Sequence, residues 1–311
     1  MRRRSIMKGT TAIGAAAALG LSLSACSVEE EGGGDSGGSS DSIDFNLPEG
    51  EGELTMAIIP GWDEGVVATE VWRQALEDAG YDVTVEEVSE AGVLYQGLAD
   101  GDIDVYLDGW LPITHASYME EFGDQLEKIG TWNENAVLTV AVPTYVEDVD
   151  SLTELNDNAE MFGNRIVGIE PSAGLTEAVL ENTIPTYGIE DLELETSTTA
   201  TMLSELDSAI AAEEPIVVTL WQPHWAYSKY DLKNLEDPEK TLGEIETINT
   251  LATAGFSDEH PELAEVLSTF KMTDEQLAGL EQVVFDEHEG DVEAGVTAWL
   301  EENSFQELFA S

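Results

Sequence analysis

Short apolar runs alternate with stretches of helical spacing along most of this 311-residue chain. The runs at 54–59, 81–88 and 103–107 have the length and composition of strands, and residues 66–79 and 91–99 between them repeat apolar side chains at helical intervals. Strands that alternate with helices usually pair in parallel. The pattern therefore predicts an α/β fold in which helices flank mostly parallel sheets.

The same rhythm begins again in the middle of the chain. Further strands and helices alternate at 137–142, 166–169, 176–181, 192–195, 202–212 and 216–220. A last strand is predicted at 245–251, and the chain is helical from there to its end, with Thr273 as the N-terminal cap of one helix. Two α/β units and a returning strand predict a two-lobed clamshell, with lobe 1 at 52–142 plus 246–311 and lobe 2 at 143–245.

The N-terminus has the pattern of an export signal. Basic residues precede an apolar stretch at 11–23, which is too short to span a bilayer as a permanent helix. The residues LSAC that end at Cys26 resemble a lipobox, in which the cysteine becomes the first mature residue and carries a lipid anchor. We therefore predict a lipoprotein signal peptide at 1–26 and a flexible, acidic Gly/Ser tether at 27–51. The basic residues also fit a twin-arginine signal, so the export route stays open.

Acidic residues dominate the charge of the chain. The sequence has 65 Asp and Glu against 11 Lys and Arg, for a net charge of −54. Such a surface excludes nucleic acid and anionic lipid as electrostatic partners. The acids are spread along the whole chain, which favours a solvated surface adapted to high salt, where the Debye length shrinks to ~3 Å at 1 M, over a local patch that attracts cations.

Three tryptophans follow predicted strands directly, at turn-like positions: Trp62, Trp110 and Trp221. Ligands of open α/β sheets bind outside the carboxyl ends of the strands, so indoles there are available to a ligand. Trp is also the best aromatic partner for a desolvated cation, at roughly 0.5–2 kcal/mol per contact. We predict that the three indoles form a cage for a quaternary ammonium group.

The other tryptophans are predicted to pack inside the protein. Trp72 falls on the apolar face of a helix, and Trp132, Trp225 and Trp299 are expected in the core or directly behind the site. Tyr118 and Tyr227 are predicted at the rim of the pocket, and His260 and His288 are predicted to be exposed.

A carboxylate at the other end of such a ligand needs hydrogen-bond donors. The segment GIEPSAGLT at 168–176 predicts a strand, a turn of small residues and a helix start, whose backbone N–H groups near Gly174 and Leu175 suit an anion. An ordinary turn between a strand and a helix has the same composition. His115 offers a ring N–H shortly after Trp110, although a loop histidine is more often solvated. His224 could likewise face a ligand, or it could brace its loop by a hydrogen bond to the backbone.

No motif in the sequence marks a catalytic or metal site. The acidic stretch at 100–108 fails the EF-hand pattern, because Val105 and Leu111 occupy the places of its Gly and Glu. The sequence has neither a phosphate loop nor GxSxG, and its single cysteine and four histidines lack metal-ligand spacing. We predict a binding protein without cofactor, metal or catalytic residues; a hydrolase on a similar scaffold and a surface adhesion or scaffold protein stay open as alternatives.

Three segments resemble the glycine betaine-binding proteins of osmoprotectant ABC importers: YQGLADGDIDVYLDGWLPITH, PIVVTLWQPHWAYSKYDLKNLEDP and VGIEPSAGL. The resemblance covers about 54–299. It implies a type II periplasmic-binding-protein clamshell with an aromatic box between the lobes. Trp62 and Trp110 come from one lobe and Trp221 from the other, while His115 and the backbone N–H groups of the Gly174–Leu175 turn hold the ligand carboxylate.

The same resemblance implies the partners and the location. The ligand is glycine betaine or a close analogue, and the macromolecular partners are an ABC permease and its ATPase subunits. The protein is expected as a monomer on the extracytoplasmic face of the cell membrane, attached through Cys26. A receptor for choline, carnitine, proline betaine or a sulfonium analogue stays open. Two features depart from the family: Ser172-Ala173 stands where an additional Gly is common, and the surface is unusually acidic.

Overall fold

A computed structural model of the chain describes residues 47–48 and 52–309. The predicted signal peptide, the lipid attachment at Cys26 and all of the predicted tether except Leu47 and Pro48 lie outside these residues. The structure therefore concerns the two predicted α/β units.

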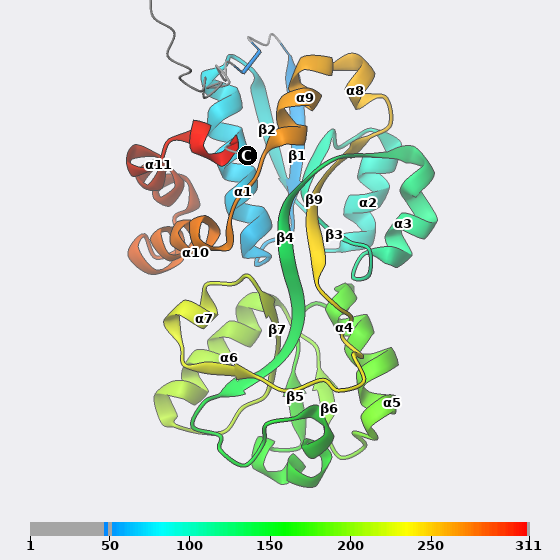
Figure 1. Cartoon of the computed structure of the whole chain (residues 1–311), viewed down its shortest axis with the longest axis vertical. Coiled ribbons are helices and arrows are strands. Elements are labelled where there is room, and N and C mark those ends of the chain that lie inside the picture. Colours follow the sequence, from blue (N-terminus) through cyan, green and yellow to red (C-terminus); the bar gives the residue numbers. More distant parts are fainter. Residues whose placement is uncertain (1–46, 49–51, 310–311) are drawn as a thin grey trace, which may run out of the picture. The chain divides into compact units, whose positions relative to one another are not determined.

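One sheet is built mainly from the first unit (Figure 1). In spatial order its strands are β2 (Asp82–Glu87), β1 (Glu53–Ile58), β3 (Val105–Leu111), β9 (Glu246–Thr253) and the first part of β4 (Leu126–Pro143). Strand β1 pairs in parallel with β2 and β3, whereas β9 runs antiparallel to β3 and β4. The helices that accompany this sheet are α1 (Asp63–Asp78), α2 (Ala91–Asp100), α3 (Ala116–Phe122), α8 (Phe256–Glu259), α9 (Pro261–Thr269), α10 (Asp274–Gln282) and α11 (Val292–Glu302).

A second sheet is built from the second unit. Its strands are the second part of β4, then β7 (Val218–Gln222), β5 (Arg165–Val167) and β6 (Glu193–Glu195), with β8 (Leu232–Asn234) beside β4. Strand β5 is parallel to β6 and β7, and β4 is antiparallel to β7 and β8. The helices here are α4 (Gly174–Ala178), α5 (Ile184–Tyr187), α6 (Thr199–Ala212) and α7 (Ala226–Lys229). Short helical turns complete the described chain at Gly123–Gln125, Leu152–Glu154, Asn156–Phe162, Val179–Thr183, Val283–Glu287 and Phe305–Phe309.

Strand β4 connects the two sheets without a break (Figure 1). Ala136 still pairs with Glu246 of β9, whereas Val137 already pairs with Gln222 of β7. The α/β prediction is confirmed, although the sheets are mixed rather than mostly parallel: the parallel pairs lie where strands alternate with helices, and β3–β9, β4–β9, β4–β7 and β4–β8 are antiparallel. The antiparallel pairs arise because β4 and β9 pass between the units rather than returning through a helix. The exact lobe bounds at 142/143 and 245/246 stay a prediction.

The sequence pattern places most elements within a few residues of their observed bounds, and β4 is the main exception. It starts at Leu126, well before the predicted start at 137. Its early part is irregular, with register shifts between Lys128 and Gly130 and again near Asn133, so the period-two pattern that signals a strand is lost there. The predicted cap of α10 is confirmed, because the Thr273 hydroxyl accepts the backbone N–H of Gln276 at 3.2 Å.

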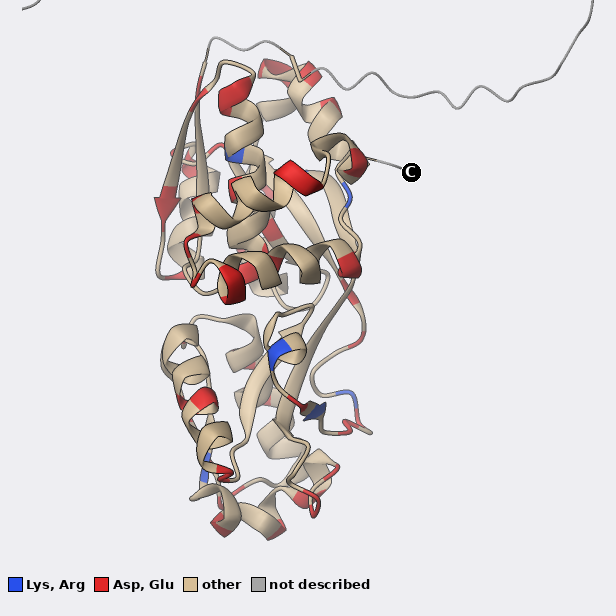
Figure 2. Cartoon of the chain, turned by 90° about the vertical axis from the view of Figure 1, so that its left-hand side faces the viewer, with Lys and Arg blue, Asp and Glu red and all other residues tan. Residues whose placement is uncertain are grey.

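Acidic residues are distributed over helices and loops around both sheets, with Lys and Arg at few positions (Figure 2). This distribution follows the even spread of acids along the sequence. Within residues 52–309, no helix has the length and apolar character that crossing a membrane requires. Adaptation of the surface to high salt stays a prediction.

Trp72 lies in the core, as the helical spacing predicts. It is fully buried on α1, and its ring meets Phe270, Phe305 and Phe309 edge-on at centroid distances of 5.5, 5.4 and 5.7 Å. Edge-to-face packing of this kind adds to the free energy gained from burial. Trp132 is equally buried, so these indoles serve stability rather than ligand binding.

Replacing Trp72 with Ala is expected to lower the free energy of unfolding by about 3–5 kcal/mol, because a large cavity opens among the three phenylalanines. Urea unfolding followed by circular dichroism measures the change. Val93→Ala is the control, since Val93 is 61% exposed on α2 and should cost less than about 0.5 kcal/mol. Similar losses in both variants would contradict the assignment of Trp72 to the core.

Candidate functional site

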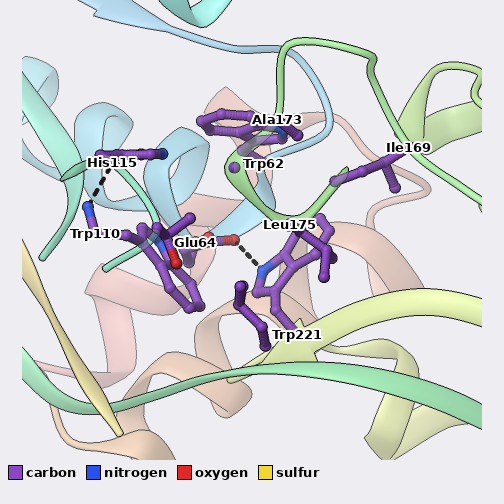
Figure 3. Close-up of a pocket in the computed structure, with 11 residues that line it drawn as sticks. Trp62, Glu64, Trp110, His115, Ile169, Ala173, Leu175 and Trp221 are labelled. Atoms are coloured by element: carbon purple, nitrogen blue, oxygen red, sulfur yellow. Dashed lines mark hydrogen bonds between the residues drawn. The ribbon is translucent and has the colours of Figure 1, made fainter. Parts of the chain in front are cut away.

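A cavity lies where the two α/β units meet (Figure 3). Its walls are Trp62, Glu64, Trp110, Thr114 and His115 from the first unit, and Leu138, Ile169, Ala173, Gly174, Leu175 and Trp221 from the second unit and the strand β4 that leads into it. All six residues that the sequence predicts as ligand contacts line this one space. Their binding of a ligand stays a prediction.

The three indoles are placed by strand ends and a helix start. Trp62 stands in the turn just before α1, as predicted. Trp110 and Trp221 do not follow their strands but lie within them, so that part of the prediction is wrong. Antiparallel pairing extends both strands: Trp110 pairs with Ile248 of β9 and Trp221 with Leu138 of β4.

Each indole of the cavity donates its ring N–H to a buried carboxylate. The donor and acceptor pairs are Trp62 with Glu170 at 3.4 Å, Trp110 with Asp108 at 2.8 Å and Trp221 with Glu64 at 2.9 Å. Figure 3 shows the rings on different sides of the same space, with the Trp221–Glu64 bond dashed. Because the polar edge of each ring is engaged, its π face and apolar edge remain for the cavity.

His115 presents one hydrogen-bond donor. Its Nδ1 accepts the backbone N–H of Trp110 at 3.1 Å and lies 2.9 Å from the hydroxyl of Tyr95. A backbone N–H can only donate, so Nδ1 carries no proton, and burial lowers the pKa of His115 to about 3. The ring is therefore neutral with its proton on Nε2. No hydrogen bond links Nε2 to the rest of the described chain, and the ring stacks on Trp62 with centroids 5.6 Å apart.

A buried acid fixes the loop that carries His115. The carboxylate of Glu246, at the start of β9, accepts the backbone N–H groups of Ile113 at 2.5 Å and Thr114 at 2.8 Å, and also the Thr114 hydroxyl. The loop thus has a defined position before any ligand arrives.

Gly174 is required by close approach of the two halves. A Cβ at this position would lie 2.0 Å from the carbonyl oxygen of Thr114, which no side chain allows. Gly174 and Leu175 begin α4, where backbone N–H groups have no carbonyl of their own helix to bind. The predicted donors therefore sit in the cavity wall opposite the loop of Thr114 and His115.

Further hydrogen bonds join the two halves around the cavity. The Tyr118 hydroxyl donates to the carbonyl of Ser172 at 2.7 Å, and the Trp225 indole donates to Asp63 at 2.6 Å. Together with the Trp62 and Trp221 bonds, they describe a form in which the walls are in contact.

Several predicted neighbours of the site lie outside the cavity wall. The Tyr118 hydroxyl donates to the carbonyl of Ser172, and the Tyr227 hydroxyl lies 2.7 Å from that of Thr139. Neither tyrosine lines the cavity, and their place at its rim stays a prediction. His224 braces its loop by accepting the Ala226 N–H at 3.0 Å. The prediction that His260 and His288 are exposed is wrong, since both are half-buried. In the described residues, no group of three or more His, Cys, Asp or Glu is arranged to hold a metal ion.

The sequence analysis missed the buried acids behind the indoles. Burial raises the pKa of Asp63 to about 7 and that of Glu64 to about 8, and it raises the pKa values of Asp108 and Glu281 well above their ordinary range. Glu64 also lines the cavity. Asp63 and Glu64 stand in the first turn of the helix directly after Trp62, where acids are usually interpreted as stabilising the helix dipole, so the sequence did not mark them as buried.

Residues 52–302 match the model of the family described as the substrate-binding domain of the ABC-type glycine betaine transport system. The chain belongs to this family. The resemblance drawn from the sequence motifs is thereby confirmed, and the site described above lies within the matched region.

Relatives of known structure confirm the fold of this family member. The glycine betaine/L-proline-binding protein ProX of Borrelia burgdorferi is 30% identical, with a TM-score of 0.76 over 83% of this chain and 97% of that one. Lactococcal OpuAC, in its closed form with glycine betaine, is 30% identical, with a TM-score of 0.75 over 84% of this chain and all of that one. The two-lobed periplasmic-binding-protein architecture is confirmed by this similarity.

A curated relative matches part of the chain. The glycine betaine/carnitine transport binding protein GbuC of Listeria monocytogenes is 36% identical over 150 residues, which is 47% of this chain and 49% of GbuC. The match thus spans about half the length of that relative.

The buried acids predict how stability depends on pH. Asp63 and Glu64 have folded pKa values of about 7 and about 8, above the ordinary values of 3.8 and 4.5 expected when unfolded. These two acids therefore hold more protons in the folded protein than in the unfolded chain, and their contribution to the free energy of unfolding falls as pH rises from about 4.5 through 8. The buried His115 and His224, with pKa values lowered to about 3, contribute stability that rises with pH up to about 6.5, so the contribution of the acids is clearest above that pH. A tenfold change in proton affinity corresponds to about 1.4 kcal/mol, so the total fall is several kcal/mol.

Urea unfolding at a series of pH values in molar salt measures this dependence. Glu64→Gln should flatten it, whereas Glu87→Gln, which changes an exposed acid on β2, should leave it as in the parent protein. The same pH dependence above about pH 6.5 in Glu64→Gln and in the parent protein would contradict burial of Glu64 in protonated form.

Proposed function

We propose that this protein is the extracytoplasmic receptor of an ABC importer and binds glycine betaine, or a close quaternary ammonium analogue, for osmoprotection. The proposal rests on one observation: three indoles and the Nε2–H group of His115 line the same cavity. A trimethylammonium group has no hydrogen-bond donor and keeps its charge, so it binds best to aromatic faces. A carboxylate binds best to preorganised N–H donors.

The two ends of glycine betaine match the two kinds of wall. The onium end is assigned to the space among Trp62, Trp110 and Trp221. The carboxylate end is assigned to Nε2 of His115 and the backbone N–H groups of Gly174 and Leu175. Choline lacks the carboxylate and would leave these buried donors without an acceptor, at a cost of about 1–3 kcal/mol for each such group. Carnitine keeps both ends, and the name of GbuC includes it.

Transport requires the receptor to change between two states. Each half of the molecule supplies only part of the cage, so a ligand that contacts both halves favours the closed form. We assign lobe 1 to 52–142 plus 246–311 and lobe 2 to 143–245, with β4 and the segment before β9 as the connections. The closed monomer then docks on a membrane permease, whose ATPase subunits supply the energy.

The proposal also covers attachment to the membrane and a role in binding without catalysis. Cys26 is assigned as the lipid anchor and 27–51 as the tether that gives the receptor reach. The protein is proposed to be a carrier and not an enzyme, because His115 and the backbone N–H groups of the cavity wall are placed to orient a ligand carboxylate, and the Thr114–Glu246 hydrogen bond fixes their loop.

Titrating tryptophan fluorescence with glycine betaine, carnitine and choline in molar salt tests the ligand assignment. Glycine betaine should bind more tightly than choline by at least tenfold, since about 1.4 kcal/mol corresponds to each tenfold change. Tighter binding of choline would overturn the assignment of His115 and Gly174 to a carboxylate. No response to any of the three would remove support for the receptor function.

The cage itself is tested by substitution. Trp110→Ala and Trp221→Ala should each weaken glycine betaine binding by ten- to a hundredfold, or about 1.4–2.7 kcal/mol. Trp72→Phe is the matched control, because it changes a tryptophan of the core without touching the cavity. Binding that is lost in the control but kept in the cage variants would show that the indoles are wrongly assigned.

A further inference from the structure

Glu64 differs from every other residue of the cavity wall. The remaining wall residues are aromatic, aliphatic, Gly or Thr, apart from His115, which burial keeps neutral. Glu64 is only 2% exposed, and one carboxylate oxygen accepts the N–H of Trp221 at 2.9 Å. It is therefore the wall residue able to place a negative charge next to a ligand.

The acids around Glu64 have no counter-ion. Asp63 precedes it on α1, Tyr106 and Asp108 face it from β3, Glu281 faces it from α10, and Trp221 contacts it from β7. Among the described residues, no Lys or Arg forms an ion pair with these acids, and His224, 3.8 Å from Asp63, is kept neutral by burial.

The missing counter-ion matters because buried charges are costly unless they are paired. Both oxygens of Glu281 also lack a hydrogen-bond partner in the described structure, which fits a protonated acid beside its neighbours. Glu64 in the cavity wall and the buried acids behind it thus compete for protons. A cation within the cage supplies the opposite charge that the surrounding residues do not.

We propose that the carboxylate of Glu64 strengthens the preference of the cage for a cationic head group over a neutral group of the same shape, and that binding of the cation is linked to ionisation of Glu64. This inference rests on the proposed function. The indole faces already favour a trimethylammonium group over a tert-butyl group, because a cation is attracted to the π face of an aromatic ring. Glu64 adds a full negative charge in the cavity wall, which the indoles do not supply.

The direction of the proton linkage follows from the same contacts. Burial, followed by the charge of Asp63, raises the pKa of Glu64 to about 8, while hydrogen bonds including that of Trp221 lower it. A bound cation favours the ionised carboxylate and brings the pKa down. Affinity for the cation therefore rises as pH rises toward about 8 and levels off above it, and binding below this pH releases protons.

Two ligands of equal shape separate charge from fit. Glycine betaine and 3,3-dimethylbutyrate differ in the central atom of the head group, which is a charged nitrogen in one and a neutral carbon in the other. Their dissociation constants are measured by calorimetry in molar salt for the parent protein and for Glu64→Gln. Gln keeps an oxygen that accepts the N–H of Trp221, so the ring stays in place while the charge is lost.

Glu64→Gln should weaken binding of glycine betaine by tenfold or more, which corresponds to about 1.4 kcal/mol or more of binding free energy. The same variant should change binding of 3,3-dimethylbutyrate by less than about threefold. Equal losses for both ligands would overturn the proposal, because they would show a role in shape alone. Asp63→Asn is the control: this acid also accepts an indole N–H but does not line the cavity. An equal loss of discrimination in Asp63→Asn would assign the effect to the cluster instead of Glu64.

The parent protein alone provides a second test that needs no variant to fold. Between about pH 6 and 9 both ligand carboxylates stay ionised, and the preference for glycine betaine should increase with pH. A preference independent of pH would overturn the proton linkage. If the parent protein fails to bind glycine betaine at any pH, the proposed function falls and this inference with it, whereas tight binding without discrimination by Glu64 removes the inference alone.

Discussion

Hydrogen bonds from indole N–H groups to buried carboxylates position the residues on which the site depends. Burying an indole N–H or a carboxylate alone is unfavourable, but each satisfies the other. Glu64 with Trp221 and Glu170 with Trp62 also join opposite halves of the molecule. The same bonds therefore orient the rings and bring the walls of the cavity together.

The path of β4 explains how two separate sheets contribute to one cavity. The strand pairs with β9 up to Ala136 and with β7 from Val137, so the ends of β3 and β7 are held on facing sides. Two connections between the halves permit a change in their angle with little change inside either sheet. The close contact of Gly174 with the carbonyl of Thr114 marks where the halves meet, and it accounts for glycine at that position.

The sequence predicted the parts of the site that depend on chain order, and it missed those that depend on contacts across the molecule. The spacing of Trp72 on a helix identified it as core, and the turn after β1 identified the place of Trp62, whereas Trp110 lies within β3 and not in a turn after it. Glu64 could not be recognised, because an acid in the first turn of a helix is normally solvated and only the fold places Trp221 on it. The early part of β4 escaped for a different reason, since its bulges erase the strand period.

A crystal structure of the protein with glycine betaine, grown in molar salt, would locate both ends of the ligand. We expect the trimethylammonium group among Trp62, Trp110 and Trp221, with the carboxylate at hydrogen-bond distance from Nε2 of His115. A ligand bound elsewhere, or bound with its carboxylate toward the three indoles, would contradict the proposed cage.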